Sequence, residues 1–308
     1  MMYTIETKSN NTPELNQYII KNEGLGFKAI MLPNLGASLQ HLSINNVEII
    51  DGISLDSKGL DSYNNTFKSA IIFPFFGRIP KGHYRFKNKS YYFKCNSPDQ
   101  STAIHGHLYN KSFKQTHLEL SADHAKIIFE YLHESRHLEY PFPYKMTIGY
   151  FFSNNTLNID VEITNLGTTA LPFGLGWHPY FKTESLEKSQ LNFRADKQVL
   201  FNEKLLPEGN TALKYKLPFR VQDHFLDDGF VLEDPAFEFD VPEYKFNLQF
   251  SSPPPNSYLQ AYIPENRKSI ALEPLTCVPN CLNNGIGLQE IQSKNTFSWK
   301  VQMNFQFP

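Results

Sequence analysis

The chain has 308 residues, of which 14% are aromatic and 19% charged, and its formal net charge is −2. This near-balanced charge gives no electrostatic basis for binding nucleic acid or an anionic membrane surface. No apolar run approaches the roughly 20 residues of a membrane-spanning helix, and the first residues lack the features of a secretion signal. The three cysteines, Cys95, Cys277 and Cys281, form no Cys-x-x-Cys pair, so free thiols and a reducing, cytoplasmic location are expected.

Short segments in which apolar and polar residues alternate recur along the chain, as in half-buried strands. In chain order the expected strands are residues 27–32, 91–94, 117–120, 126–131, 144–150, 156–163, 246–250, 269–272 and 297–303. Turns are expected where Asn, Asp, Gly and Pro gather, at residues 154–155, 165–167, 227–229 and 253–255.

The pattern contains no amphipathic helix longer than three turns and no regular alternation of strands with helices. Many short strands separated by turn residues predict an all-β protein, an antiparallel sandwich or barrel. The composition does not shift along the chain, so residues 1–308 are interpreted as a single domain. The alternative is a boundary near residues 141–143, although strand patterns of the same kind lie on both sides of it.

Residues 133–137 read His-Glu-Ser-Arg-His and match the zinc-protease pattern, in which two histidines share one face of a helix. A strand pattern precedes this segment, and prolines follow it closely, which argues against a helix. We therefore predict a charged turn between two strands here, and no metal site.

Two segments carry histidines in settings suited to acid–base chemistry. Residues 174–182 place His178 among glycines, aromatic residues and a proline, and residues 103–108 place His105 directly before a glycine. Histidine titrates near neutral pH, as a general acid or base must. Taken alone, the segment around His178 favours a structural histidine buried in an aromatic core, and a structural role is also the alternative for His105.

Two further segments carry a charged residue beside apolar ones. Arg78 lies in the aromatic segment 75–86, where its planar guanidinium is suited to donating to two hydroxyls at once, or to a surface salt bridge. Glu273 follows the apolar strand 269–272. A carboxylate in that setting is either a base with a raised pKa or the partner of a buried arginine.

Taken together, these four segments resemble the aldose 1-epimerase (galactose mutarotase-like) family. The matching motifs occur in the family's order: Arg78-Ile79, His105-Gly106, His178-Pro179-Tyr180-Phe181, and Glu273-Pro274 through Pro279-Asn280. The resemblance extends from about Gly26 to Phe305. It implies a large antiparallel β-sandwich, which agrees with the strand pattern.

The resemblance also implies roles for individual residues. His178 would be the general acid, Glu273 the general base, and His105 an assisting group at the ring oxygen. Arg78 and Asp227 would hold sugar hydroxyls, with Asp228 as the alternative to Asp227. Of the aromatic neighbours, Trp177 and Tyr180 are candidates to stack on the sugar, and core packing is the alternative for both.

Three positions depart from the family pattern. Gly77 stands where the best-known members carry Asn, His107 replaces a second glycine, and Leu275 replaces a polar residue. Specificity for galactose or glucose is therefore not implied by the resemblance.

The implied function is interconversion of the α and β anomers of a free aldose, with a small sugar as substrate and no metal or other cofactor, by a monomer or homodimer. Two alternatives stay open. A hexose-6-phosphate 1-epimerase would add a basic phosphate clamp, with Lys81, Arg85 and Lys182 as candidates. A non-catalytic carbohydrate-binding protein would keep the sandwich without turnover.

Overall fold

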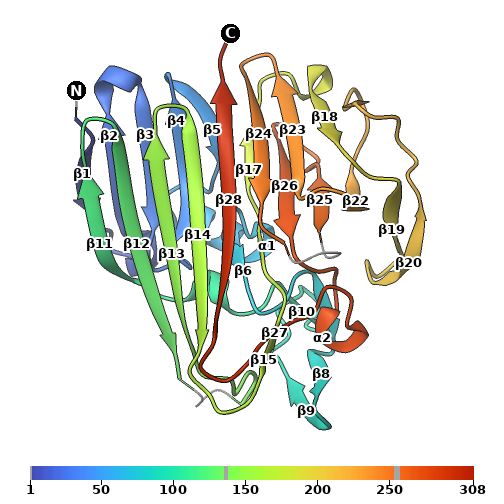
Figure 1. The fold of residues 1–308 in the computed structure, drawn as a ribbon. Coiled ribbons are helices and arrows are strands. Elements are labelled where there is room, and N and C mark those ends of the chain that lie inside the picture. Colours follow the sequence, from blue (N-terminus) through green and yellow to red (C-terminus); the bar gives the residue numbers. More distant parts are fainter. Residues whose placement is uncertain (1, 135–137, 253–256) are drawn as a thin grey trace.

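The computed structural model describes residues 2–134, 138–252 and 257–308, and within them two large antiparallel sheets pack face to face (Figure 1). The first sheet follows the order β1 (Thr4–Lys8), β2 (Gln17–Asn22), β3 (Phe27–Leu32), β4 (Ser38–Ile44), β5 (Val47–Asp51), β17 (Tyr180–Lys182), β26 (Ser269–Leu275), β25 (Tyr258–Tyr262), β22 (Asp227–Val231), β19 (Lys197–Phe201) and β20 (Pro207–Ala212). Two short strands extend it, β16 (Gly176–Trp177), which pairs with β26, and β6 (Ile71–Ile72), which pairs with β16.

The second sheet follows the order β11 (Lys114–Leu120), β12 (His124–His133), β13 (Tyr144–Ser153), β14 (Thr156–Asn165), β28 (Thr296–Gln306), β24 (Tyr244–Phe250), β23 (Ala236–Val241), β18 (Gln190–Phe193) and β21 (Phe219–Arg220). Three two-stranded sheets join β7 (Arg78–Pro80) with β10 (Thr102–Ile104), β8 (His83–Phe86) with β9 (Lys89–Tyr92), and β15 (Leu171–Phe173) with β27 (Gln289–Ile291). The helical segments of the described residues are α1 (Ser57–Thr66), α2 (Cys281–Asn284), and the short turns η1 (Pro13–Leu15), η2 (Glu23–Leu25), η3 (Leu108–Asn110) and η4 (Leu186–Lys188).

The core lies between the two sheets and is rich in aromatic side chains. Alternate residues of β14, from Leu157 to Ile163, are fully buried, as the sequence alternation predicts. Phe181 on β17 packs against Phe246 on β24, with ring centroids 4.5 Å apart, and so joins the centres of both sheets. Because side chains alternate along a strand, the neighbours of Phe181 face away from the second sheet.

The predicted strands are all present, with boundaries that differ by a few residues, and the all-β sandwich is confirmed. The predicted turn at 227–229 is wrong, because these residues belong to β22. The sheet accommodates the charge of Asp228 because Lys214 Nζ and Tyr215 OH donate hydrogen bonds to its carboxylate, at 2.7 and 2.8 Å. The predicted turn at 253–255 lies outside the described residues.

The segment with the zinc-protease pattern begins at the end of a strand. β12 ends at His133, whose ring is buried and stacks on Tyr144. This confirms the strand that the sequence predicted before the pattern, while residues 135–137 lie outside the described part of the chain. None of the described helices has the length and apolar character needed to cross a membrane.

Candidate active site

A cavity of about 470 Å³ lies on the face of the first sheet that points away from the second sheet. It extends across five strands that are neighbours in the sheet, from β17 through β26, β25 and β22 to β19. Residues two positions apart share one face of a strand, which explains why alternate residues line it. The strand residues and their direct neighbours in the wall are His178, Tyr180, Ser269, Glu273, Gln260, Tyr262, Asp227 and Phe201.

The facing wall of the cavity comes from connecting segments rather than from the sheet. It contains residues 65–68, at the end of α1 and directly after it, and residues 76–78, which lead into β7. Residues 104–105, where β10 ends, and Pro279 complete this wall. All of the segments that resembled the family motifs therefore meet at one cavity. They are far apart in the sequence, and the pairing of β7 with β10 and of β17 with β26 brings them together.

His178 and Glu273 form the centre of the site. Gly176 pairs with Leu275 and Tyr180 with Ala271, so the same register places His178 opposite Glu273. Nε2 of His178 lies 3.5 Å from Oε1 of Glu273, and the two side chains are only 7% and 2% exposed. His178 Nδ1 and Glu273 Oε2 have no hydrogen-bond partner among the described residues. Buried polar atoms without partners are costly, which suits a site that supplies those partners through a ligand.

Burial acts on the charge of both members of this pair. It lowers the pKa of His178 to about 3 and raises the pKa of Glu273 well above its usual value, with the nearby Asp227 charge adding to the second shift. A low-dielectric environment disfavours an isolated charge of either sign. Burial therefore favours two neutral groups, with one titratable proton on the pair.

His105 approaches His178 from the facing wall. Its ring lies edge-on to His178 with centroids 5.2 Å apart, and it packs against Phe67 and Phe76. The backbone N–H of Gly77 donates to Nδ1 at 3.4 Å, which leaves the proton of the neutral ring on Nε2. Burial, then the neighbouring His178 and Arg78, hold the pKa of His105 well below the usual range, so the ring is a neutral donor.

Asp227 and Arg78 both line the cavity. Gln260 Nε2 donates to Oδ1 of Asp227 at 2.8 Å. Burial raises the pKa of Asp227, and the Arg78 charge acts in the opposite direction. Asp228, the alternative in the sequence, is bonded to Lys214 and does not line the cavity, whereas Asp227 does.

Of the two aromatic candidates, only Tyr180 lies in the cavity wall. Its ring stacks on His178 at 5.2 Å, nearly parallel. Trp177 is fully buried, donates from Nε1 to Ser69 Oγ, and packs edge-on against Phe181 in the core. Alternation along the chain turns Trp177 and His178 to opposite faces, and this corrects the expectation that Trp177 contacts a substrate.

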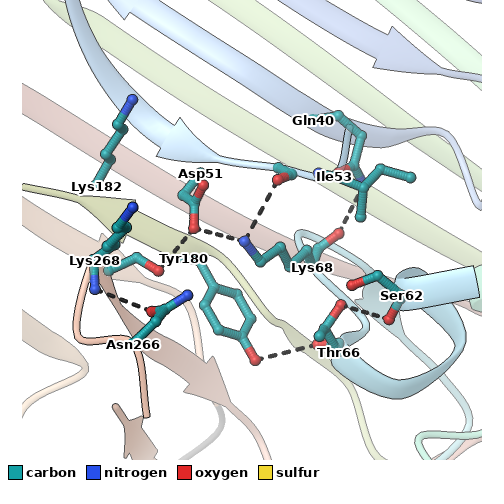
Figure 2. A network of polar contacts seen from close by, with 12 residues as sticks. Gln40, Asp51, Ile53, Ser62, Thr66, Lys68, Tyr180, Lys182, Asn266 and Lys268 are labelled. Carbon is teal, nitrogen blue, oxygen red and sulfur yellow. Dashed lines mark hydrogen bonds and ion pairs between the residues drawn. The ribbon is translucent and has the colours of Figure 1, made fainter. Parts of the chain in front are cut away.

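Lys68 also lines the cavity, although no sequence motif marks it. Its Nζ forms an ion pair with Asp51 (Figure 2), and the two charged atoms lie 2.6 Å apart. Ser269 Oγ donates to the same carboxylate at 2.8 Å. The ammonium also lies over the ring of Tyr180, 5.2 Å from its centroid. Lys68 thus braces the ring on which His178 stacks. The sequence analysis also did not identify Gln260, because this residue lies in none of the motifs.

The chain around Lys68 is also bonded to the backbone of His178. The N–H of Ser69 donates to the His178 carbonyl at 2.7 Å, and the N–H of His178 donates to the Ala70 carbonyl at 3.0 Å. Phe67 and Ser69 adopt left-handed φ values of +50° and +58°, which are unfavourable for such residues. Strained backbone of this kind gathers at functional sites, and here it positions the histidine.

The three departures from the family pattern have distinct surroundings. Gly77 has φ +65°, and a Cβ there would lie 2.6 Å from Pro279 Cγ. The ring of His107 turns away from the cavity and reaches the hydroxyl of Tyr144 at 3.1 Å, as alternation predicts. Leu275 is buried in the core. Only the first of the three departures changes the cavity wall.

A family model described as aldose 1-epimerase matches residues 17–305. The chain is 25% identical over 233 residues to the uncharacterized protein YihR of Escherichia coli (strain K12), an alignment that covers 72% of this chain and 74% of YihR.

Solved structures show the same fold. A galactose mutarotase-like protein from Clostridium acetobutylicum superposes with a TM-score of 0.85 at 17% identity, over 99% of both chains. The galactose 1-epimerase from Lactobacillus acidophilus NCFM superposes with a TM-score of 0.79 at 19% identity, over 99% of this chain and 98% of the other.

Proposed function

The chain belongs to the aldose 1-epimerase family, and on that basis we propose that it interconverts the α and β anomers of an aldose. The observation that carries the proposal is the buried pair of His178 and Glu273, 3.5 Å apart in the wall of a cavity large enough for a small ligand. Such a pair supplies the acid and the base that this isomerisation needs.

In the proposed reaction, Glu273 removes the proton from the anomeric hydroxyl while His178 protonates the ring oxygen. The C1–O5 bond breaks, and an aldehyde forms at C1. After rotation about C1–C2, the ring closes on the opposite face, and each proton returns along the reverse path. Atoms and charges balance without an oxidant or a second substrate.

These roles set a requirement on the proton that the pair holds. The reaction begins with Glu273 ionised and His178 protonated, whereas burial favours the neutral pair. Transfer of one proton from the carboxyl to the imidazole converts the neutral pair into the reactive ion pair. A sugar hydroxyl at the unpartnered Oε2 and the ring oxygen at the histidine would stabilise the resulting charges.

Three other side chains are proposed to hold and assist the sugar. His105 donates from its protonated Nε2 to the developing charge on the ring oxygen, consistent with the acceptor role of its Nδ1. Arg78 and the Gln260-bound carboxylate of Asp227 bind hydroxyls. Complementary donors and acceptors of this kind orient the ring for reaction.

The non-catalytic alternative is less well supported by the same observations. A protein that only binds a sugar has no need for a buried carboxyl and imidazole without partners, an arrangement that reduces stability. The phosphate-clamp alternative also loses two of its three candidates, because Arg85 and Lys182 do not line the cavity, and Lys182 is paired with Glu48.

Polarimetry tests the proposal directly. The protein should accelerate mutarotation of at least one aldose, and Glu273→Gln and His178→Ala should each lower the rate by about 10²–10⁴-fold. Glu162→Gln is the matched control, since Glu162 is exposed on β14 in the other sheet. Wild-type rates in either site variant would overturn the assignment.

A further inference from the structure

A second cavity of about 500 Å³ adjoins the first, and the two share Arg78 and Ile104 in their walls. The other residues that concern the argument are Lys81, Lys204, Asp99 and Ser101. Because Arg78 lines both spaces, a ligand seated in the first cavity reaches the second by passing this guanidinium.

The charge in the second cavity is unbalanced. Within the part of the chain that the structure describes, the side chains of Arg78, Lys81 and Lys204 make no ion pair or hydrogen bond. The single carboxylate of the wall, Asp99, accepts hydrogen bonds from Ser97 Oγ and Ser101 Oγ, both at 2.6 Å, and from the Ser101 N–H. Three cations thus face one carboxylate whose oxygens are already engaged.

Local backbone structure fixes the place of both lysines. Lys81 adopts a left-handed φ of +55° in the turn after β7, and its N–H donates to the Ser101 carbonyl at 2.8 Å. Lys204 lies in the turn between β19 and β20, where Asn202 Oδ1 accepts from the N–H groups of Lys204 and Leu206. Leu205, next in the chain, lines the first cavity, so this turn lies at the border of the two.

We propose that the second cavity binds an anionic group carried by the aldose, a phosphate ester or a carboxylate on a carbon remote from C1. This inference rests on the proposed function and specifies its substrate class. Oxyanions are the ligands that Arg and Lys side chains recognise through charge-assisted hydrogen bonds. Arg78 then has two tasks, because it binds a hydroxyl in the first cavity and the anionic group at the border.

The test compares neutral and anionic aldoses at fixed ionic strength, so that screening is constant. Mutarotation rates are measured for glucose, glucose 6-phosphate and glucuronic acid, and for galactose and its 6-phosphate. We expect KM to be lower for an anionic sugar, and the double variant Lys81→Gln/Lys204→Gln to raise that KM about tenfold or more. Rates with neutral sugars should not change. Glucuronic acid separates recognition of a carboxylate from recognition of a phosphate.

Arg85→Gln and Lys182→Gln are the matched controls, because these cations lie outside both cavities and should change neither KM. The inference is overturned if neutral sugars are the better substrates and the double variant has the same KM and rate as the wild type for every sugar. Absence of mutarotation with every sugar would instead overturn the proposed function. In that case calorimetric binding of glucose 6-phosphate to the wild type and the double variant still decides whether the second cavity binds an anion.

Discussion

His178, in the two-residue link between β16 and β17, lies opposite Glu273 of β26, with 3.5 Å between Nε2 and Oε1. The distance follows from the strand register on either side of the pair rather than from a flexible loop. A shift of one residue between β17 and β26 would turn Glu273 to the core face. Sites on paired strands hold their geometry more closely than sites on loops.

The pH dependence of the reaction should reflect the pair as a unit, since it must hold one proton. Burial lowers the pKa of His178 to about 3 and raises that of Glu273, so the one-proton form extends over a wide range. We expect a bell-shaped profile of kcat/KM whose acidic limb lies below about 6.5, the usual pKa of histidine. Initial polarimetric rates, corrected for the spontaneous reaction, give this profile. An acidic limb at the unperturbed histidine value would contradict it.

Asp227→Asn should have two separable effects. Loss of a charged hydroxyl partner should raise KM about tenfold, which corresponds to one charge-assisted hydrogen bond. Because the Asp227 charge contributes to the raised pKa of Glu273, its removal should also move the alkaline limb to lower pH. Asp228→Asn is the control, since Asp228 is held by Lys214 and Tyr215 outside the cavity. If Asp227→Asn leaves both KM and the limb unchanged, Asp227 is not a sugar ligand.

Glu273→Gln should stabilise the fold at alkaline pH while it removes activity. In the unfolded chain the carboxyl ionises above about 4.3, whereas the raised pKa of the folded state keeps it protonated. The wild type therefore loses stability as pH rises through this interval, by up to about 1.4 kcal/mol per pH unit. Urea unfolding at pH 5 and pH 8 should show a stability difference that favours the variant and widens at pH 8. A difference that is constant with pH would show that Glu273 titrates normally.

Gly77→Asn tests the departure from the family pattern. Asn tolerates left-handed φ, but a Cβ at this position would lie 2.6 Å from Pro279, which lines the cavity. We expect a loss of about 1–3 kcal/mol in stability from overpacking, together with a lower kcat/KM. Gly285→Asn is the matched control, because Gly285 has φ +75° with no atom within 4 Å of the added Cβ. Equal stability of the two variants would show that Pro279 moves without cost.

Local sequence patterns predicted most strands of the second sheet because apolar alternation depends only on which face of a strand is buried. The same rule, applied to residues 177–181, also separates Tyr180 in the cavity from Trp177 in the core. The interpretation of Asp227 as a turn residue was wrong, because β22 pairs with β25 at this point. Gln260 on β25 donates a hydrogen bond to the carboxylate, which makes an aspartate acceptable within the sheet. Composition alone cannot show that a carboxylate has a partner far along the chain.

Residues whose positions depend on tertiary contacts could not be predicted either, because their partners are distant in the sequence. Lys68 is placed by Asp51 and Tyr180, and neither contact leaves a pattern in the neighbouring sequence. Lys81 was singled out as a phosphate candidate, but its companion Lys204 depends on the position of the turn after β19. Family motifs marked the proposed reacting groups, whereas the side chains that surround them were identified only from the structure.

The turn that carries Lys204 and Leu205 belongs to a hairpin at the edge of the first sheet, and most side chains of its outer strand, β20, are exposed. Insertions, deletions and replacements are tolerated best in such peripheral segments. Of the proposed acid and base, Glu273 lies on the interior strand β26, and His178 lies in the short link between β16 and β17, which both pair with β26. Under the proposed roles, remodelling of this edge hairpin can therefore change sugar preference in related proteins while the central sheet keeps the reacting pair in place.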